Sequence, residues 1–379
     1  MLANVIGMIA LGFILLGLLT RSGLLIPLPL LSGVASAGLA YQLGSGPVVA
    51  TLDAVAVVLG AGAYLWALRL RTRRQRPDRM PVTRRVIASI AGVGDNPQSV
   101  ALGPDGRSAY VGANDSGTLA VVDLDIREVR ALVPVGRGAA DLLVLPGGER
   151  VLVAVVKLLG GRLVIVDPAA GQVTGTVAEV RQPRGMAASP DGRSVYVTSM
   201  ADHKLWRLDA RTLEVTGSAT VGKRPVSVAA SPDGAKLYVA NFWSDSVSVL
   251  DAATLETTAT FPTRGPGNLA LDGRGERLYV TGVDGTLGTF DTATGQPAGA
   301  PAKGDSEGGL AVANGFCYVA DPWAGMVRVY EADRLYWRDE LVLGGRAPIA
   351  LAVGPDGLLY VAGQAGRLDV VRPEQPSGG

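Results

Sequence analysis

Basic side chains recur between the repeated units of this chain, once or twice at almost every junction. A ring of cations set around a central opening is suited to binding an anionic small molecule or an acidic protein surface. The alternative is that each cation pairs with an aspartate in a neighbouring loop, which would make the cations structural. The residues concerned are Arg137, Arg184, Lys223, Arg224, Arg264, Lys303 and Arg346.

Two tryptophans fall in segments whose turn residues predict exposed loops. Trp243 lies within the segment 241–245, and Trp323 lies within 321–325. Exposed tryptophan frequently anchors protein–protein interfaces, because one large ring buries much area on binding. The alternative is that the rings cover the junctions between units.

The single histidine, His203, could act as a general base. Arg184 or Arg224 would then be its partner in a lactonase-like hydrolase. No second histidine and no acidic cluster accompanies His203. Catalysis at His203 is therefore the less favoured interpretation.

Composition argues against a metal or haem centre within the chain. There is one cysteine, Cys317, one histidine and no Cys-x-x-Cys-His motif. No cluster of histidines and cysteines could hold zinc, iron or copper, so no cofactor is expected. This sets the chain apart from haem-binding reductases. One cysteine also excludes a disulfide within the chain, which agrees with a reducing compartment.

The elements that would position these residues come from a repeat of about 42 residues. Tyr196 and Tyr238 mark the same position in two of its copies, and seven units fit between residues 85 and 371. Pro-Asp-Gly turns the first strand into the second, and Asp-x-x-Thr turns the third into the fourth. A period of this size with four short strands predicts an all-β seven-bladed β-propeller.

The seventh unit is completed by residues from the other end of the repeat region. Its own strands end at residues 367–371, which leaves a fourth strand missing. The segment 85–90 has the pattern of a fourth strand, and pairing it with the last unit would close the ring and remove an open edge. The tail, 372–379, is predicted to be disordered.

The repeat resembles that of the YVTN family of seven-bladed propellers. Ser231-Pro232-Asp233-Gly234, Leu237-Tyr238-Val239-Ala240 and Val247-Ser248-Val249-Leu250-Asp251 carry the resemblance. Other units depart from this pattern but keep turn residues, as in Leu145-Pro146-Gly147-Gly148. The resemblance implies the fold and leaves the function open.

Residues 1–68 have the composition of membrane helices. Apart from Arg21 and Asp53, they contain no charged side chain. The ranges 2–20, 24–41 and 48–68 are each long enough to be a transmembrane helix. We predict three helices, with two as the alternative because Pro27 and Pro29 interrupt the middle range.

An arginine-rich linker, residues 69–84, follows the last of these helices. Clustered positive charge beside a membrane helix predicts that the linker and the propeller lie on the cytoplasmic side. It also favours contact with anionic lipid headgroups. The propeller itself is close to neutral, which argues against a nucleic-acid partner. The cluster consists of Arg69, Arg71, Arg73, Arg74, Arg76 and Arg79.

These features together predict a multi-pass protein of the cytoplasmic membrane. Its expected role is that of a non-catalytic scaffold or accessory subunit of a larger integral membrane protein complex, for which a respiratory or photosynthetic complex is a candidate. The alternatives are the lactonase-like hydrolase and a module that binds or senses a small anion.

Overall fold

The computed structural model describes residues 85–157, 160–303, 308–343 and 347–373. The membrane helices predicted at 2–68, the arginine-rich linker 69–84 and most of the tail lie outside this part of the chain. No helix among the described residues is long and apolar enough to cross a membrane.

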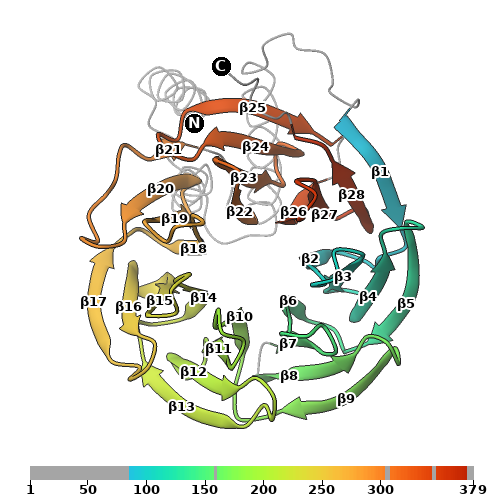
Figure 1. The fold of residues 1–379 in the computed structure, drawn as a ribbon, viewed down its shortest axis with the longest axis horizontal. Helices are drawn as coiled ribbons and strands as arrows, with labels where there is room; N and C mark the ends of the chain where they lie inside the picture. The colour runs from blue at the N-terminus through green and yellow to red at the C-terminus, as the bar shows by residue number, and fades with distance from the viewer. Residues whose placement is uncertain (1–84, 158–159, 304–307, 344–346, 374–379) are drawn as a thin grey trace, which may run out of the picture. The chain divides into compact units, whose positions relative to one another are not determined.

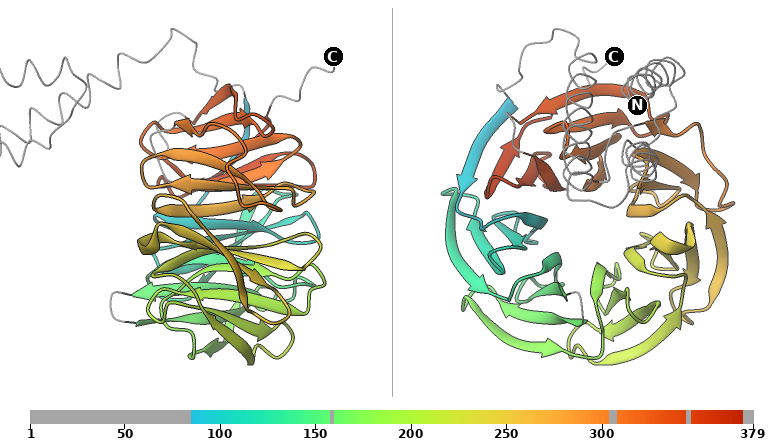
Figure 2. Two further views of the ribbon diagram at one scale, coloured as in Figure 1. Left: turned by 90° about the vertical axis from the view of Figure 1, so that its left-hand side faces the viewer. Right: turned by 180° about the vertical axis from the view of Figure 1, so that it is seen from behind.

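Seven four-stranded antiparallel sheets are arranged around a ring (Figure 1), which confirms the predicted seven-bladed propeller. Each blade runs from an inner strand beside the axis to an outer strand on the rim, and Figure 2 shows the same ring from the side and from behind.

The strands of the first four blades follow the repeat closely. Blade 1 contains β2 (Pro97–Leu102), β3 (Ser108–Ala113), β4 (Thr118–Asp123) and β5 (Glu128–Pro134). Blade 2 contains β6 (Ala139–Val144), β7 (Val151–Lys157), β8 (Gly160–Asp167) and β9 (Gln172–Val177). Blade 3 contains β10 (Pro183–Ala188), β11 (Ser194–Ser199), β12 (Lys204–Asp209) and β13 (Val215–Thr220). Blade 4 contains β14 (Pro225–Ala230), β15 (Lys236–Asn241), β16 (Ser246–Asp251) and β17 (Thr257–Pro262), with a short 3-10 turn, η2 (Phe242–Ser244), between β15 and β16.

The remaining blades have shorter strands in places. Blade 5 contains β18 (Pro266–Leu271), β19 (Arg277–Gly282), β20 (Thr286–Asp291) and β21 (Ala302–Lys303). Blade 6 contains β22 (Leu310–Ala313), β23 (Phe316–Asp321), β24 (Met326–Glu331) and β25 (Trp337–Val342). Blade 7 contains β26 (Pro348–Val353), β27 (Leu359–Gly363), β28 (Arg367–Val371) and β1 (Val86–Ala91).

Ring closure by a strand from the start of the repeat region is confirmed. β1 pairs antiparallel with β28, and Val86 lies opposite Val371. The strand begins one residue later than predicted, at Val86. Because β1 completes blade 7, the last blade has no unpaired outer edge on β28.

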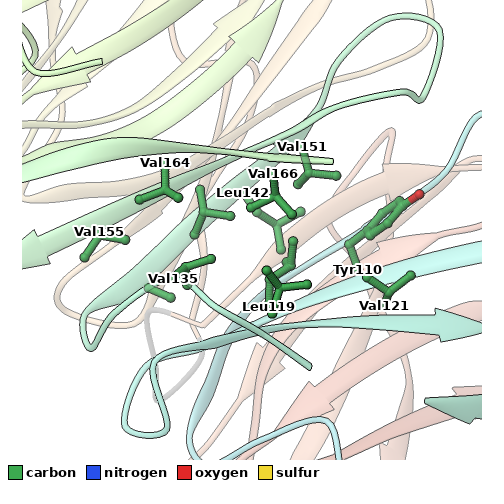
Figure 3. Close-up of a cluster of buried hydrophobic side chains, with 12 residues drawn as sticks. Tyr110, Leu119, Val121, Val135, Leu142, Val151, Val155, Val164 and Val166 are labelled. Carbon is green, nitrogen blue, oxygen red and sulfur yellow. The ribbon is translucent and has the colours of Figure 1, made fainter. Parts of the chain in front are cut away.

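The hydrophobic core is divided into seven clusters of buried side chains among the described residues, each between two consecutive blades. Figure 3 shows the cluster between blades 1 and 2, where Tyr110 and Leu119 meet Leu142 and Val164. The cluster that joins blade 7 to blade 1 includes Ile90 of the closing strand. Each blade therefore buries both faces against its neighbours, which makes the ring rigid.

The ring has two faces that differ in the segments they carry. We call the loop face the one that carries the links from the second to the third strand of each blade and the junctions between blades. We call the turn face the one that carries the Pro-Asp-Gly and Asp-x-x-Thr turns. On the turn face, Gly106 has φ +65° and packs against Pro355 of blade 7, so the turns also join consecutive blades. The described chain begins on the turn face, since Arg85 precedes the first residue of an outer strand.

Candidate functional site: the loop face

The loop face carries most of the basic residues singled out from the sequence. Arg137, Lys223, Arg264 and Lys303 are exposed and form no ion pair with any described residue. Arg264 lies near Asp284, whose pKa is lowered chiefly by a hydrogen bond from Thr286 and also by the arginine charge. Arg346 lies outside the described residues.

Several turn-face cations are instead bonded to backbone carbonyl groups. Arg150 of blade 2 donates from Nη2 to the carbonyl oxygens of Ala210 and Arg211 of blade 3, at 3.0 and 2.9 Å. Arg207 donates in the same way to Ala253 of blade 4, at 2.8 Å. These cations hold neighbouring blades together, as does Arg184 on the loop face, which donates to the carbonyl of Ala140 in blade 2 at 3.4 Å. The exposed Arg137, Lys223, Arg264 and Lys303 form no such bond with a described residue. Pairing with loop aspartates is seen at a different arginine, Arg181, which binds Asp202.

Trp243 stands at the centre of a fixed cluster formed by three segments of the loop face. Trp243 is 61% exposed, and the guanidinium of Arg224 lies over its ring at 4.7 Å from the ring centroid. The amide of Trp243 donates to the carbonyl of Lys223 at 3.1 Å, and the amide of Lys223 donates to Ser244 Oγ at 2.7 Å. The loop is therefore held in one conformation before any partner binds, which lowers the entropy cost of binding.

Trp323 is the more exposed of the two tryptophans, at 86%. Its turn is anchored by the buried carboxylate of Asp321, which accepts from the amide of Ala324 at 2.9 Å. Asp321 in turn pairs with Arg328 at 2.8 Å. Both tryptophans lie in exposed loops as predicted, and the ring of Trp243 also lies against Arg224 at the junction between blades 3 and 4.

His203 belongs to the Trp243 cluster. Its backbone has φ 55°, and its Nδ1 accepts a hydrogen bond from the amide of Arg224 at 3.2 Å. The structure thus brings His203 to the backbone of Arg224, while the guanidinium of Arg224 is engaged with the ring of Trp243. The arginine pairing expected for a hydrolase is not formed at Arg224.

Arg184 lines the inner strand of blade 3 and has a neighbour that the sequence did not reveal. Asp141 of blade 2 is half-buried close to it, and burial raises the pKa of Asp141 to about 6, opposed chiefly by the charge of Arg184. Asp141 Oδ1 accepts from the amide of Leu142 at 2.9 Å, and Oδ2 accepts from the amide of Met186 in blade 3 at 3.1 Å. Alignment of the repeats could have revealed Asp141, because blades 1 and 4 have serine, Ser99 and Ser227, at the position where blade 2 has this carboxylate.

Comparison with known proteins supports the propeller fold without showing the family. Residues 152–283 match the family model of the cytochrome D1 heme domain. Hydrazine synthase of Kuenenia stuttgartiensis matches with 20% sequence identity and a TM-score of 0.66, over 74% of this chain and 96% of that chain. No curated protein matches. At this identity the structural match shows the fold alone, and the YVTN resemblance stays a prediction.

The expectation of a protein that is not an enzyme is contradicted by these comparisons. The matched range, 152–283, is similar to a domain whose name specifies haem, and this range contains Arg184, His203 and Trp243. The separation from haem-associated propellers, which rested on the missing motif, is wrong for the same reason. A motif that attaches haem covalently tests only one mode of haem binding.

The side chains described here nevertheless do not fit a haem iron. His203 Nδ1 accepts an N–H bond, so the proton of the neutral ring sits on Nε2 and leaves that nitrogen without a lone pair for a metal. Cys317 is fully buried in β23, where burial raises the pKa of its thiol. No group of three or more His, Cys, Asp or Glu within the described ranges could hold a metal ion.

Proposed function

We propose that this chain is a membrane-anchored subunit of a redox enzyme assembly, in which the loop face of the propeller binds an acidic surface of a partner protein. The redox context is supported by the likeness to the cytochrome D1 heme domain and to hydrazine synthase. The membrane anchor is supported by the apolar ranges 2–20, 24–41 and 48–68. The chain's own side chains do not fit haem, so the redox group is assigned to the partner.

The observation that carries the proposal is the composition of the loop face. It presents two exposed tryptophans, Trp243 and Trp323. The same face carries Arg137, Lys223, Arg264 and Lys303, which are exposed and form no ion pair with any described residue. Aromatic anchors inside a rim of unpaired charge are the usual composition of a binding surface.

Solvent screening limits how much these exposed cations contribute to the free energy of partner binding. Exposed charges at the rim of an interface act mainly on the association rate and on its salt dependence. Their interactions are screened over a Debye length of about 8 Å at physiological salt. The energy of binding should instead be concentrated at Trp243, where Arg224 and the fixed backbone preorganise the ring.

The test is purification of the full chain from its own membranes in mild detergent, followed by identification of stoichiometric companions. The triple variant Arg137→Glu, Lys223→Glu and Arg264→Glu should lose the companion at lower salt than the wild type. The matched control reverses three exposed turn-face cations, Arg107, Arg193 and Arg274, and should retain the companion.

Two results would overturn the proposal. One is a wild-type chain that purifies alone with no companion at stoichiometric level. The other is equal loss of the companion from the loop-face and turn-face triple variants, because the face would then not matter.

A further inference from the structure

The turn face carries exposed apolar side chains in the sector where the described chain begins. Tyr336 is 60% exposed and Trp337 is 47% exposed, at the turn between β24 and β25 of blade 6. Ile126 is 60% exposed, at the turn between β4 and β5 of blade 1. Blades 6 and 1 are the two neighbours of blade 7, where the chain emerges at Arg85.

Comparison of the repeats shows that Tyr336 replaces a polar side chain, since its position is held by Glu214 in blade 3 and by Glu256 in blade 4. The position of Trp337 is apolar in other blades as well, and Trp337 there replaces a smaller side chain such as Val173. Leu335 of the same turn is buried, as is Leu255, so the turn itself is unchanged.

The same kind of replacement occurs on the other side of blade 7. Ile126 occupies the position of Thr254 in blade 4 and of Thr212 in blade 3. Tyr336 and Ile126 are therefore extra to the repeat and lie in the two blades that flank blade 7, whereas the exposed Val173 of blade 2 occupies the position of Trp337 with a smaller aliphatic side chain.

This sector is connected directly to the start of the described chain. Arg85 pairs with Asp339 of β25, two residues beyond Trp337. The amide of Arg372 donates to the carbonyl of Arg85 at 2.9 Å. Figure 1 shows β25 and β1 as neighbouring strands on the rim.

We infer that this sector of the turn face lies in the interfacial layer of the lipid bilayer. Tyrosine and tryptophan are enriched at that depth, because the ring is apolar and its polar atom stays hydrated. Local charge is balanced, since Arg338 pairs with Glu331 at 3.0 Å and Arg85 with Asp339. The aromatic rings and Ile126 thus supply the contact, while the arginines at positions 69–79 supply the attraction to anionic headgroups.

The length of the connecting chain is consistent with this placement. Residues 69–84 separate the last predicted membrane helix from Arg85. Sixteen extended residues span at most about 55 Å, and a less extended linker brings blade 7 closer to the bilayer. The inference rests on the membrane anchor of the proposed function but not on its loop-face partner. It orients the loop face away from the bilayer, where a partner can reach it.

The test uses nitroxide labels on the full chain, reconstituted into phosphatidylcholine–phosphatidylglycerol vesicles that contain a nickel-chelating lipid. Cys317 is fully buried, so the reagent reaches only an introduced thiol. Asp333→Cys places the label beside the two aromatic residues and leaves both of them in place. Arg193→Cys on blade 3 of the turn face and Asp115→Cys on the loop face are the controls.

The label at position 333 should be relaxed by the nickel lipid, and the label at 115 should not. The relaxation at 333 should fall when Tyr336→Ser and Trp337→Ser are added, with an unchanged melting temperature as the check on folding.

Each other outcome has a definite meaning. A full chain that does not float with the vesicles overturns both the membrane anchor and this inference. A chain that floats with equal relaxation at 333, 193 and 115 overturns this inference alone. Relaxation at 333 that persists in the double serine variant also overturns it, because the aromatic rings would then not make the contact.

Discussion

Replacing Asp141 by serine should make the propeller more stable at neutral pH. In the wild type the carboxylate accepts from the amides of Leu142 and Met186. The equivalent Ser227 accepts from the amide of Leu269 in the next blade, at 3.3 Å. Ser99 is the equivalent residue of blade 1, and its Oγ is buried without a partner. By analogy with Ser227 it would accept from the amide of Leu142 in the next blade, but that amide donates to Asp141 instead. In the Asp141→Ser variant, the serine hydroxyl would accept from the amide of Met186. The amide of Leu142 would then be free to donate to Ser99 Oγ.

The size of the effect follows from the pKa of Asp141. Burial raises it from 3.8 to about 6, and each unit corresponds to about 1.4 kcal/mol. Because the folded-state pKa is raised, the ionised form destabilises the protein above pH 6 and the cost fades as the pH falls. Linkage places that cost at about 3 kcal/mol at pH 7.5 and about 1 kcal/mol at pH 4.5. Allowing for the charge of Arg184 and the lost hydrogen bonds, we expect a gain of about 1–3 kcal/mol at pH 7.5.

Thermal unfolding of the full chain in mild detergent, followed by tryptophan fluorescence, measures this gain. A change of 1 kcal/mol corresponds to about 2 °C for a domain of this size, so the variant should melt about 2–6 °C higher at pH 7.5. The advantage should be smaller at pH 4.5. Ser227→Asp is the matched control: it places a carboxylate at the same position between blades 4 and 5 and should lower the melting temperature.

The reasoning would be refuted by Asp141→Ser melting no higher than the wild type at pH 7.5. It would also be refuted by a gain just as large at pH 4.5, because the effect would then not arise from ionisation. A confirmed gain would show that the chain keeps Asp141 at a cost in stability, which is typical of a functional position.

Three further predictions concern the tryptophan loop, the histidine and the topology. Arg328→Met leaves the carboxylate of Asp321 buried and uncompensated, so the free energy of unfolding should fall by about 3–5 kcal/mol. The control Arg338→Met removes an exposed pair with Glu331 and should cost less than about 1 kcal/mol. Equal losses in denaturant unfolding would contradict the structural role given to the buried pair. Haem added to the purified full chain should give the same absorption spectrum with His203→Ala as with the wild type, and a band that depends on His203 would show that its Nε2 binds iron after all. Protease added to intact cells should spare residues 85–371 if the arginine cluster places the propeller in the cytoplasm, and rapid digestion would place it on the other side.

Much of the fold follows from local patterns that the chain repeats. The interval between Tyr196 and Tyr238, the Pro-Asp-Gly turns and the fourth-strand pattern of residues 85–90 predicted seven blades and their closure, because each blade is specified by its own turns and alternation. The same patterns placed Trp243 and Trp323 in exposed loops. These features depend on neighbours along the chain, which a sequence displays directly.

Only the tertiary structure decided which side chains have partners. Asp141 is held by an amide 45 residues away and Trp243 by the guanidinium of Arg224, because ring closure brings consecutive blades into contact at separations that no local pattern encodes. The cations of the two faces look alike in the sequence, yet Arg150 reaches a carbonyl of the next blade and Arg137 reaches none. That difference arises because the packing of the blades determines where each long side chain ends.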